Sequence, residues 1–222
     1  MHQDNFFELL REIEVPKPKG IMQIGASYGQ EVELFKLNGI ENCILVEPLA
    51  SPFEYLTNIC SKTPGFVAVN ALCSNVANEK IDFHVASNGG QSSSVLKPDR
   101  HLEVFKHVKF EENIQLTTTT IDIIYEYMSS QEIYTELISS IDSIYMDVQG
   151  FEYQVLLGGS KFLKKINYIY FELIRSNLYS GLTDLMTYIV YLKSQGFIIN
   201  NLNFDKYHHS NVLFIRESLV QS

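Results

Sequence analysis

The chain has 222 residues, 45% of them hydrophobic and 19% charged, which is an ordinary composition for a globular domain with a substantial core. The net charge is −9 and the lysines and arginines are scattered, so the sequence disfavours a surface that binds nucleic acid. No apolar run approaches the roughly 18 residues of a membrane span, and the acidic, amphipathic start MHQDNFFELLREIEV is unlike a signal peptide.

Strands and helices are predicted to alternate along the chain, because apolar residues recur with a period of two in some segments and of about 3.6 in others. Residues 1–18 predict an N-terminal helix, over residues 4–14, followed by a linker that contains two prolines. The predicted strands cover residues 21–24, 43–46, 66–72, 80–86, 114–121, 143–148, 167–173, 197–202 and 212–216. The predicted helices follow the glycine turn at 25–29, the capping boxes at 51–54 and 129–132, Gly150 and residue 183.

Two segments depart from this alternation. Residues 87–113 include Gly89-Gly90 and Ser92-Ser93-Ser94, and we expect a mobile, hydroxyl-rich loop there, either a binding loop or a plain surface loop. Residues 203–211 are too few for a crossover helix, so the last two strands should be antiparallel. The expected fold is α/β and fills residues 1–222 as one domain, with a mostly parallel seven-stranded sheet, an antiparallel last strand and helices on both faces.

The stretch from Ile21 to Pro48 predicts a ligand site. The turn at 25–29 contains small residues that let a ligand approach the backbone, and the helix after it presents free N–H groups. Glu47 ends the next strand, 22 residues after Gly25, which suits an acid that binds the two hydroxyls of a ribose. Asn70 and Ala71 end the third strand on the same edge of the sheet, where ligands of open parallel sheets gather.

The spacing of the turn narrows the class of ligand. It reads Gly25-x-x-x-Gly29, and Ser27 stands where the dinucleotide fingerprint needs its second glycine to approach a pyrophosphate. A nucleoside without a pyrophosphate fits this pattern, and S-adenosylmethionine (SAM) is such a nucleoside. An ordinary strand–helix–strand crossover with a glycine turn explains the spacing alone, and Glu47 favours the nucleoside.

The later motifs resemble those of the FkbM methyltransferase family. The segments QIGASYGQE and VEP resemble its first two motifs, and YMDVQGFEYQVLLGG followed by INYIYFEL resembles its Asp-Val-(Glu/Gln)-Gly-x-Glu region and the strand after it. Residues 92–96 resemble its serine-rich segment, and residues 119–122 its threonine-leucine-aspartate. The resemblance covers about Gly20 to Arg216. It implies a Rossmann-like class I methyltransferase fold, a SAM cofactor and methyl transfer to oxygen.

The same resemblance implies roles for individual residues. Gly25, Ala26 and Gly29 would line the methionine part of SAM, Glu47 would hold the ribose, and Asn70 and Ala71 would lie near the adenine. The full set expected to bind the cofactor is Gln23, Gly25, Ala26, Ser27, Tyr28, Gly29, Glu47, Pro48, Asn70 and Ala71. The chain departs from the family in two places: Gln23 replaces an acid and can offer the SAM ammonium only a neutral hydrogen bond, and Tyr145 replaces a lysine.

Asp147 and Glu172 are the candidate catalytic residues, because both end predicted strands on the ligand edge and neither could be buried cheaply as a lone charge. They could share a divalent cation, one could be a general base with a raised pKa, or Asp147 could only orient the SAM ammonium or cap a helix. A cation is the less favoured option, because two carboxylates lack a clear third ligand. His208 and His209 are further candidates for a base, and Glu152 reads as an acid that the next helix dipole stabilises.

The predicted function is transfer of a methyl group from SAM to a hydroxyl of a small molecule or a sugar. A nicotinamide-dependent oxidoreductase is one alternative, disfavoured by Ser27, and a non-catalytic nucleoside-binding or scaffold protein is another, which Gln23 and Tyr145 keep open. Cys43, Cys60 and Cys73 form no C-x-x-C pair, which is typical of small core residues in a reducing compartment. We therefore expect a cytoplasmic protein without nucleic-acid or membrane partners.

Overall fold

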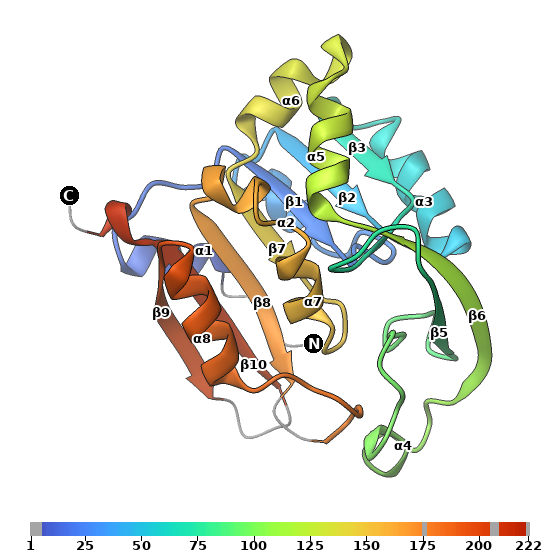
Figure 1. Ribbon diagram of the computed structural model, residues 1–222. Helices are drawn as coiled ribbons and strands as arrows, with labels where there is room; N and C mark the ends of the chain where they lie inside the picture. Colours follow the sequence, from blue (N-terminus) through green and yellow to red (C-terminus); the bar gives the residue numbers. More distant parts are fainter. Residues whose placement is uncertain (1–5, 175–176, 205–208, 221–222) are drawn as a thin grey trace.

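The computed structural model describes residues 6–174, 177–204 and 209–220 (Figure 1). The described strands are β1 (Gly20–Ile24), β2 (Asn42–Val46), β3 (Phe66–Val69), β4 (Leu72–Cys73), β5 (Lys80–Ala86), β6 (Phe110–Thr119), β7 (Ser143–Met146), β8 (Tyr168–Ile174), β9 (Phe197–Phe204) and β10 (His209–Arg216). The described α-helices are α1 (Phe6–Glu12), α2 (Val32–Leu37), α3 (Ala50–Cys60), α4 (His101–Val104), α5 (Ile121–Ser129), α6 (Thr135–Ser140), α7 (Glu152–Leu157) and α8 (Leu185–Ser194).

Seven of these strands form the large sheet, in the order β3-β2-β1-β7-β8-β10-β9. The first five run parallel to one another, whereas β10 is antiparallel to both β8 and β9. The predicted sheet, with its antiparallel last strand, is confirmed. The strand order reverses between β1 and β7, and this reversal leaves a crevice at the carboxyl edge of the sheet.

Helices cover both faces of the large sheet, as predicted (Figure 1). Along β1, Ile21 points to one face and Met22 to the other, and both are fully buried. On the face of Ile21, the sheet packs against residues of α1, α2 and α3, among them Phe6, Phe35 and Leu56. On the face of Met22, it packs against residues of α5, α6, α7 and α8. Each described helix is too short or too polar to cross a bilayer.

A second sheet of three strands, β4-β6-β5, stands beside the large one (Figure 1). The predicted strand 66–72 was wrong as a single element, since it divides into β3, in the large sheet, and β4, which pairs with the end of β6. Asn70 and Ala71 form the junction between them, and the Asn70 side chain donates hydrogen bonds to the carbonyl oxygens of Glu47 and Pro48. The small sheet therefore leaves the large one directly at the ligand edge.

Two predicted helix starts were wrong. The box at 129–132 begins at the last residue of α5, and the next α-helix, α6, begins only at Thr135. The sequence interpretation missed α5, which Thr120 caps by accepting a hydrogen bond from the Ile123 N–H. Ile133, just after the box, is 83% exposed in a 3₁₀ turn. The helix expected from the box at 51–54 begins at Ala50, and no side chain caps it.

The segment predicted as a loop, residues 87–113, contains α4 and the first residues of β6. Its serine stretch is anchored, because Ser94 exchanges two backbone hydrogen bonds with His84 of β5 and its hydroxyl donates to the Gln149 carbonyl oxygen at 2.9 Å. This segment therefore joins the small sheet to the loop that follows β7. The mobility of residues 87–113 stays a prediction.

Candidate active site

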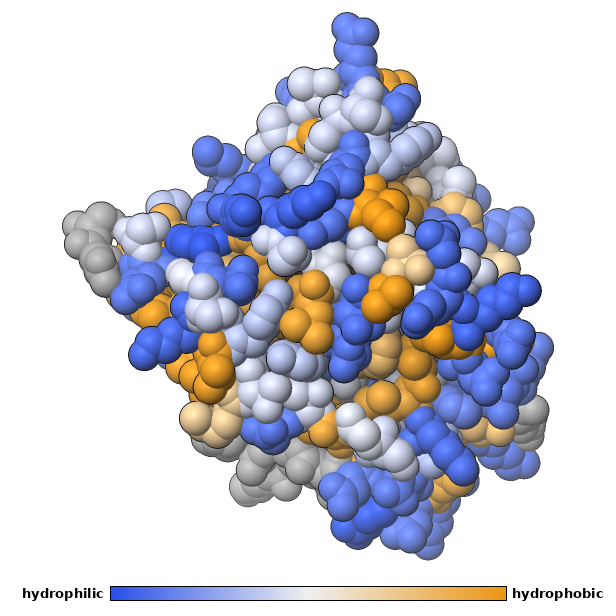
Figure 2. All heavy atoms as spheres, viewed as in Figure 1, coloured by the Kyte–Doolittle hydropathy of each residue, from blue (hydrophilic) through white to orange (hydrophobic). Residues whose placement is uncertain are grey.

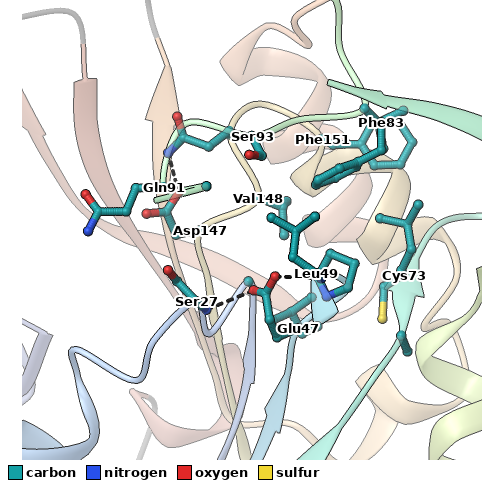
Figure 3. A pocket seen from close by; sticks show the side chains of 18 of the residues that line it. Ser27, Glu47, Leu49, Cys73, Phe83, Gln91, Ser93, Asp147, Val148 and Phe151 are labelled. Carbon is teal, nitrogen blue, oxygen red and sulfur yellow. Dashed lines mark hydrogen bonds between the residues drawn. The ribbon is translucent and has the colours of Figure 1, made fainter. Parts of the chain in front are cut away.

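A cavity of about 450 Å³ opens at the carboxyl ends of β1, β2, β7 and β8, a volume that suits a small-molecule ligand (Figure 3). β5 and the segment with Gly90 and Ser93 form the opposite wall. In the space-filling view, apolar side chains gather over the middle of the face, between the large sheet and the β5–β6 region (Figure 2). The crevice of the large sheet and the wall of the small one thus enclose one site.

Gly25 makes the close approach of β1 and β7 possible. Its φ is +80°, and a Cβ atom there would lie 1.9 Å from the carbonyl oxygen of Asp147. The N–H groups of Gly25 and Ala26 both donate to the Val46 carbonyl oxygen at 3.0 Å, so the turn bends towards β2. Position 25 must be a glycine because any side chain would collide with the backbone at the end of β7. The bend also directs the Ser27 N–H towards Glu47.

Glu47 is held in the floor of the cavity by two backbone groups (Figure 3). Its Oε2 accepts a hydrogen bond from the Ser27 N–H and its Oε1 from the Leu49 N–H, both at 2.9 Å. The residue is 5% exposed, and burial raises the pKa of this carboxyl against the opposing effect of the two N–H donors. Each carboxylate oxygen has a second lone pair, so Glu47 can accept two further hydrogen bonds from hydroxyls in the cavity.

Asp147 follows the end of β7 and faces the same cavity. Although its side chain is exposed in the open cavity, the surrounding protein displaces water from the carboxyl group and raises its pKa well above the usual value, and the charge of Glu172 raises the pKa further. The Gln149 amide donates to Asp147 Oδ1 at 2.7 Å, which opposes those effects. The Tyr179 hydroxyl lies 2.7 Å from the Ser92 carbonyl oxygen and 3.0 Å from Gln149 Oε1, and it shares its proton between these two acceptors. Asp147 is therefore an oriented acid with a pKa well above the usual value.

Glu172 lies on β8, two residues before the strand ends, and its side chain lines the cavity. Its Oε2 lies 3.2 Å from Nδ1 of His209, the first residue of β10. His209 therefore contacts the site through Glu172. The two residues are far apart in the sequence and come together because β10 pairs with β8. His208, the other candidate histidine, lies outside the described residues.

Glu152 is the first residue of α7 and is 1% exposed. Its Oε1 accepts hydrogen bonds from the N–H groups of Val148 and Gly150, at 3.1 and 3.2 Å, and burial raises its pKa to about 7. Glu152 therefore holds the backbone of the loop that follows Asp147 by hydrogen bonds. Its role is more than the predicted interaction with the helix dipole.

The structure brings together seven of the predicted site residues in the cavity wall: Gly25, Ser27, Glu47, Pro48, Ala71, Asp147 and Glu172. Five others, predicted to bind the cofactor, are not among the lining residues: Gln23, Ala26, Tyr28, Gly29 and Asn70. Ala26 is fully buried in the core, and Gly29 packs against Leu56 of α3. These residues shape the turn and the strand junction around the cavity.

Several lining residues were missed because the small sheet was not predicted. Phe83 of β5, Phe151, Leu49 and Cys73 form an apolar end of the cavity, opposite the end with Ser27 and Asp147 (Figure 3). Gly90, Gln91, Ser93 and Val95 come from the predicted loop, where the glycine pair and the serine stretch were the available signal. Cys73, read as a core residue, is buried and also lines the cavity.

Tyr145, which stands in place of the family's lysine, belongs to the core. It is 9% exposed and packs against the rings of Phe6, Phe35 and Tyr170, with centroids 6.1, 5.5 and 5.2 Å away. The side chain points away from the cavity, on the face of the sheet that α1 and α2 cover. Within the described residues, no three His, Cys, Asp or Glu side chains are grouped so that they could hold a metal ion.

The comparisons with known proteins identify the family. Residues 23–199 match the Methyltransferase FkbM domain. Over 123 residues the chain is 33% identical to 2-O-methyltransferase NoeI of Sinorhizobium fredii, which covers 53% of this chain and 47% of that protein, so the chain spans about half the length of this curated relative.

One solved structure agrees in fold, and a second has a slightly lower score. A protein of the NADB-Rossmann superfamily from Streptococcus agalactiae superposes with a TM-score of 0.50 at 10% identity, over 97% of this chain and 69% of that one. A SAM-dependent methyltransferase from Aquifex aeolicus gives a TM-score of 0.49 at 10% identity, over 95% and 88%. The sheet order and the match over most of the chain lead to one conclusion: the chain belongs to the FkbM methyltransferase domain family.

Proposed function

We propose that the protein is a SAM-dependent O-methyltransferase that acts on a hydroxyl of a small molecule or a sugar. The observation that carries the proposal is the order of groups along one cavity of about 450 Å³. The Asp147 carboxyl group lies at one end, the Glu47 carboxylate lies between, and Phe83 and Phe151 lie at the other end (Figure 3). Glu31 also lines the cavity, near enough to Asp147 for its charge to raise the pKa of that residue. SAM has the same order: a cationic amino acid, a ribose with two hydroxyls, and a flat adenine.

The residues fit this cofactor in chemistry as well as in order. Glu47 keeps lone pairs for the ribose hydroxyls while the N–H groups of Ser27 and Leu49 fix its position. The acidic end favours a ligand with net positive charge there, because a cation would relieve the repulsion among the neighbouring carboxylates. A phosphate in the same place would meet those charges unfavourably, which also disfavours a dinucleotide and a nucleic acid.

SAM when bound supplies an activated methyl group, so the protein must align the acceptor hydroxyl and take up its proton. Asp147 is placed to accept this proton, because it faces the cavity and its raised pKa makes it a stronger base than an ordinary aspartate. Gln149 and Glu152 hold Asp147 and its loop in position. Glu172, which is paired with His209, contributes a negative charge near Asp147 that raises the pKa of Asp147.

The acceptor is proposed to be a small molecule or a sugar, since NoeI is named as a 2-O-methyltransferase and the chain shares a third of the aligned residues with it. A cytoplasmic location, a single domain and the lack of a nucleic-acid partner belong to the same proposal. A nicotinamide-dependent oxidoreductase and a non-catalytic nucleoside-binding protein are the alternatives that the experiment must separate.

Calorimetric titration with SAM and, in parallel, with NAD separates these functions. We expect saturable 1:1 binding of SAM and no heat with NAD, because the turn offers no second glycine for a pyrophosphate. Heat with NAD alone would favour the oxidoreductase. SAM binding without formation of S-adenosylhomocysteine (SAH), across a panel of glycosides and small alcohols, would favour the non-catalytic protein.

A further inference from the structure

Gln23, the residue in place of the family's acid, is buried and holds the carboxylate of Glu31 by a hydrogen bond. It lies on β1 and is 1% exposed, on the face of the sheet that also holds Tyr145. Its Nε2 donates a hydrogen bond to Oε2 of Glu31 at 2.7 Å. Its Oε1 makes no hydrogen bond to the described part of the chain. An amide is therefore kept in the core, where it orients the Glu31 carboxylate.

Glu31 lies at the cavity, not in the core. It lines the same wall as Gly25, Gln30 and Asp147, and its negative charge is one of the causes that raise the pKa of Asp147. Although Glu31 directly precedes α2, its side chain does not cap that helix. The carboxylate is thus directed by Gln23 to the acidic end of the cavity, beside the Gly25 turn.

We propose that Glu31, positioned by Gln23, receives the ammonium group of the cofactor's amino acid. The inference rests on the proposed function, and it assigns to this chain a charged group that Gln23 itself cannot supply. A charge-assisted hydrogen bond between an ammonium and a carboxylate is about twice as strong as a neutral one, and the low dielectric of a cavity strengthens it. Gln23 is a positioning residue, which acts only through Glu31.

The test compares two ligands that differ in the amino-acid part. SAH carries the ammonium, whereas 5′-methylthioadenosine has the same adenosine and sulfur without it. We expect Glu31→Gln to weaken SAH binding about 10-fold or more, by the loss of one charge-assisted hydrogen bond, and to leave the affinity for 5′-methylthioadenosine within about twofold. The readout is the ratio of the two dissociation constants from calorimetry, which a general loosening of the fold would not change.

Gln23→Leu tests the positioning role, because leucine fills the buried site without an amide. We expect a smaller loss of SAH binding, again without an effect on 5′-methylthioadenosine, and no further loss when Gln23→Leu is combined with Glu31→Gln. The matched control is Glu33→Gln, which removes an exposed carboxylate in the first turn of α2 that is paired with Lys36. This control should leave both affinities unchanged.

The possible outcomes distinguish a failure of the role proposed for Glu31 from a failure of the proposed methyltransferase function. If the wild-type protein binds both ligands and Glu31→Gln leaves their ratio unchanged, the role of Glu31 is wrong and the proposed function stands. If Glu31→Gln weakens both ligands equally, Glu31 is structural and the inference also fails. If the wild-type protein binds neither SAH nor 5′-methylthioadenosine, the proposed function and the inference fail together.

Discussion

Replacing Asp147 by asparagine is expected to lower the rate of methyl transfer about 10²–10⁴-fold, the usual contribution of a well-placed general base. Asparagine keeps the size of the side chain and an oxygen that can still accept the hydrogen bond from Gln149. It cannot take up the proton that the acceptor hydroxyl loses. The rate is measured as SAH formation, with a glycoside or alcohol that the wild-type protein methylates.

The same substitution should not destabilise the protein at neutral pH. Loss of water around the carboxyl group within the cavity and the charge of Glu172 raise the pKa of Asp147 in the folded state above its value in the unfolded chain. Ionisation therefore costs the folded state free energy as the pH rises above about 4, where the unfolded chain ionises. The Asp147→Asn variant escapes this cost, so its free energy of unfolding should equal or exceed that of the wild type at pH 7, and the difference should vanish below about pH 4.

Asp82→Asn is the matched control, because Asp82 is exposed on β5, away from the cavity wall, and its carboxylate accepts a hydrogen bond from the Gln115 amide at 3.5 Å. It should retain both the rate and the stability of the wild type. An Asp147→Asn protein that is folded and turns over at the wild-type rate would remove Asp147 from the chemistry.

Gly25→Ala is expected to have the largest effect on stability, a loss of about 3–5 kcal/mol in the free energy of unfolding. A residue with a Cβ at a φ of +80° costs roughly 1–2 kcal/mol by itself. The added methyl would also lie 1.9 Å from the Asp147 carbonyl oxygen, which is backbone, so β1 and β7 would have to move apart. SAM binding should be lost, since this movement also displaces Ser27 and Asp147. Urea unfolding and calorimetry measure the two effects.

Gly181→Ala separates the backbone conformation from the collision. Gly181 also has a positive φ, +83°, but a methyl group there would come no closer than 3.9 Å to Leu96. It should lose only about 1–2 kcal/mol. Equal losses for the two variants would show that the contact between Gly25 and Asp147 is not what makes the glycine necessary.

The large sheet could be predicted because its signals are local. Each parallel strand is a short apolar run, and the short connection between the last two predicted strands is enough to predict that β9 and β10 are antiparallel. The small sheet could not be predicted, because the junction at Asn70 and Ala71 sits inside a single apolar run, FVAVNAL. Helix α5 was missed because its sequence, IDIIYEYMS, follows a β-branched strand and is itself rich in isoleucine and tyrosine.

The site was predictable where a residue ends a strand, as Glu47 and Asp147 do, since the ends of parallel strands meet at one edge. The site was not predictable where contacts between distant parts of the chain determine which side chains meet. Gln23 was expected to reach the cofactor, yet its side chain points to the core face and meets Glu31, the last residue of the QIGASYGQE motif, to which no role was assigned. Likewise Glu172 and His209 come together only because β10 inserts beside β8.

The most direct test of the account is a crystal structure of the protein with SAH. The account predicts one SAH in the cavity, with the ribose hydroxyls on Glu47, the adenine between Phe83 and Phe151, and the amino-acid end towards Glu31 and Asp147. An SAH molecule bound elsewhere, or bound with its adenine at the acidic end, would contradict it.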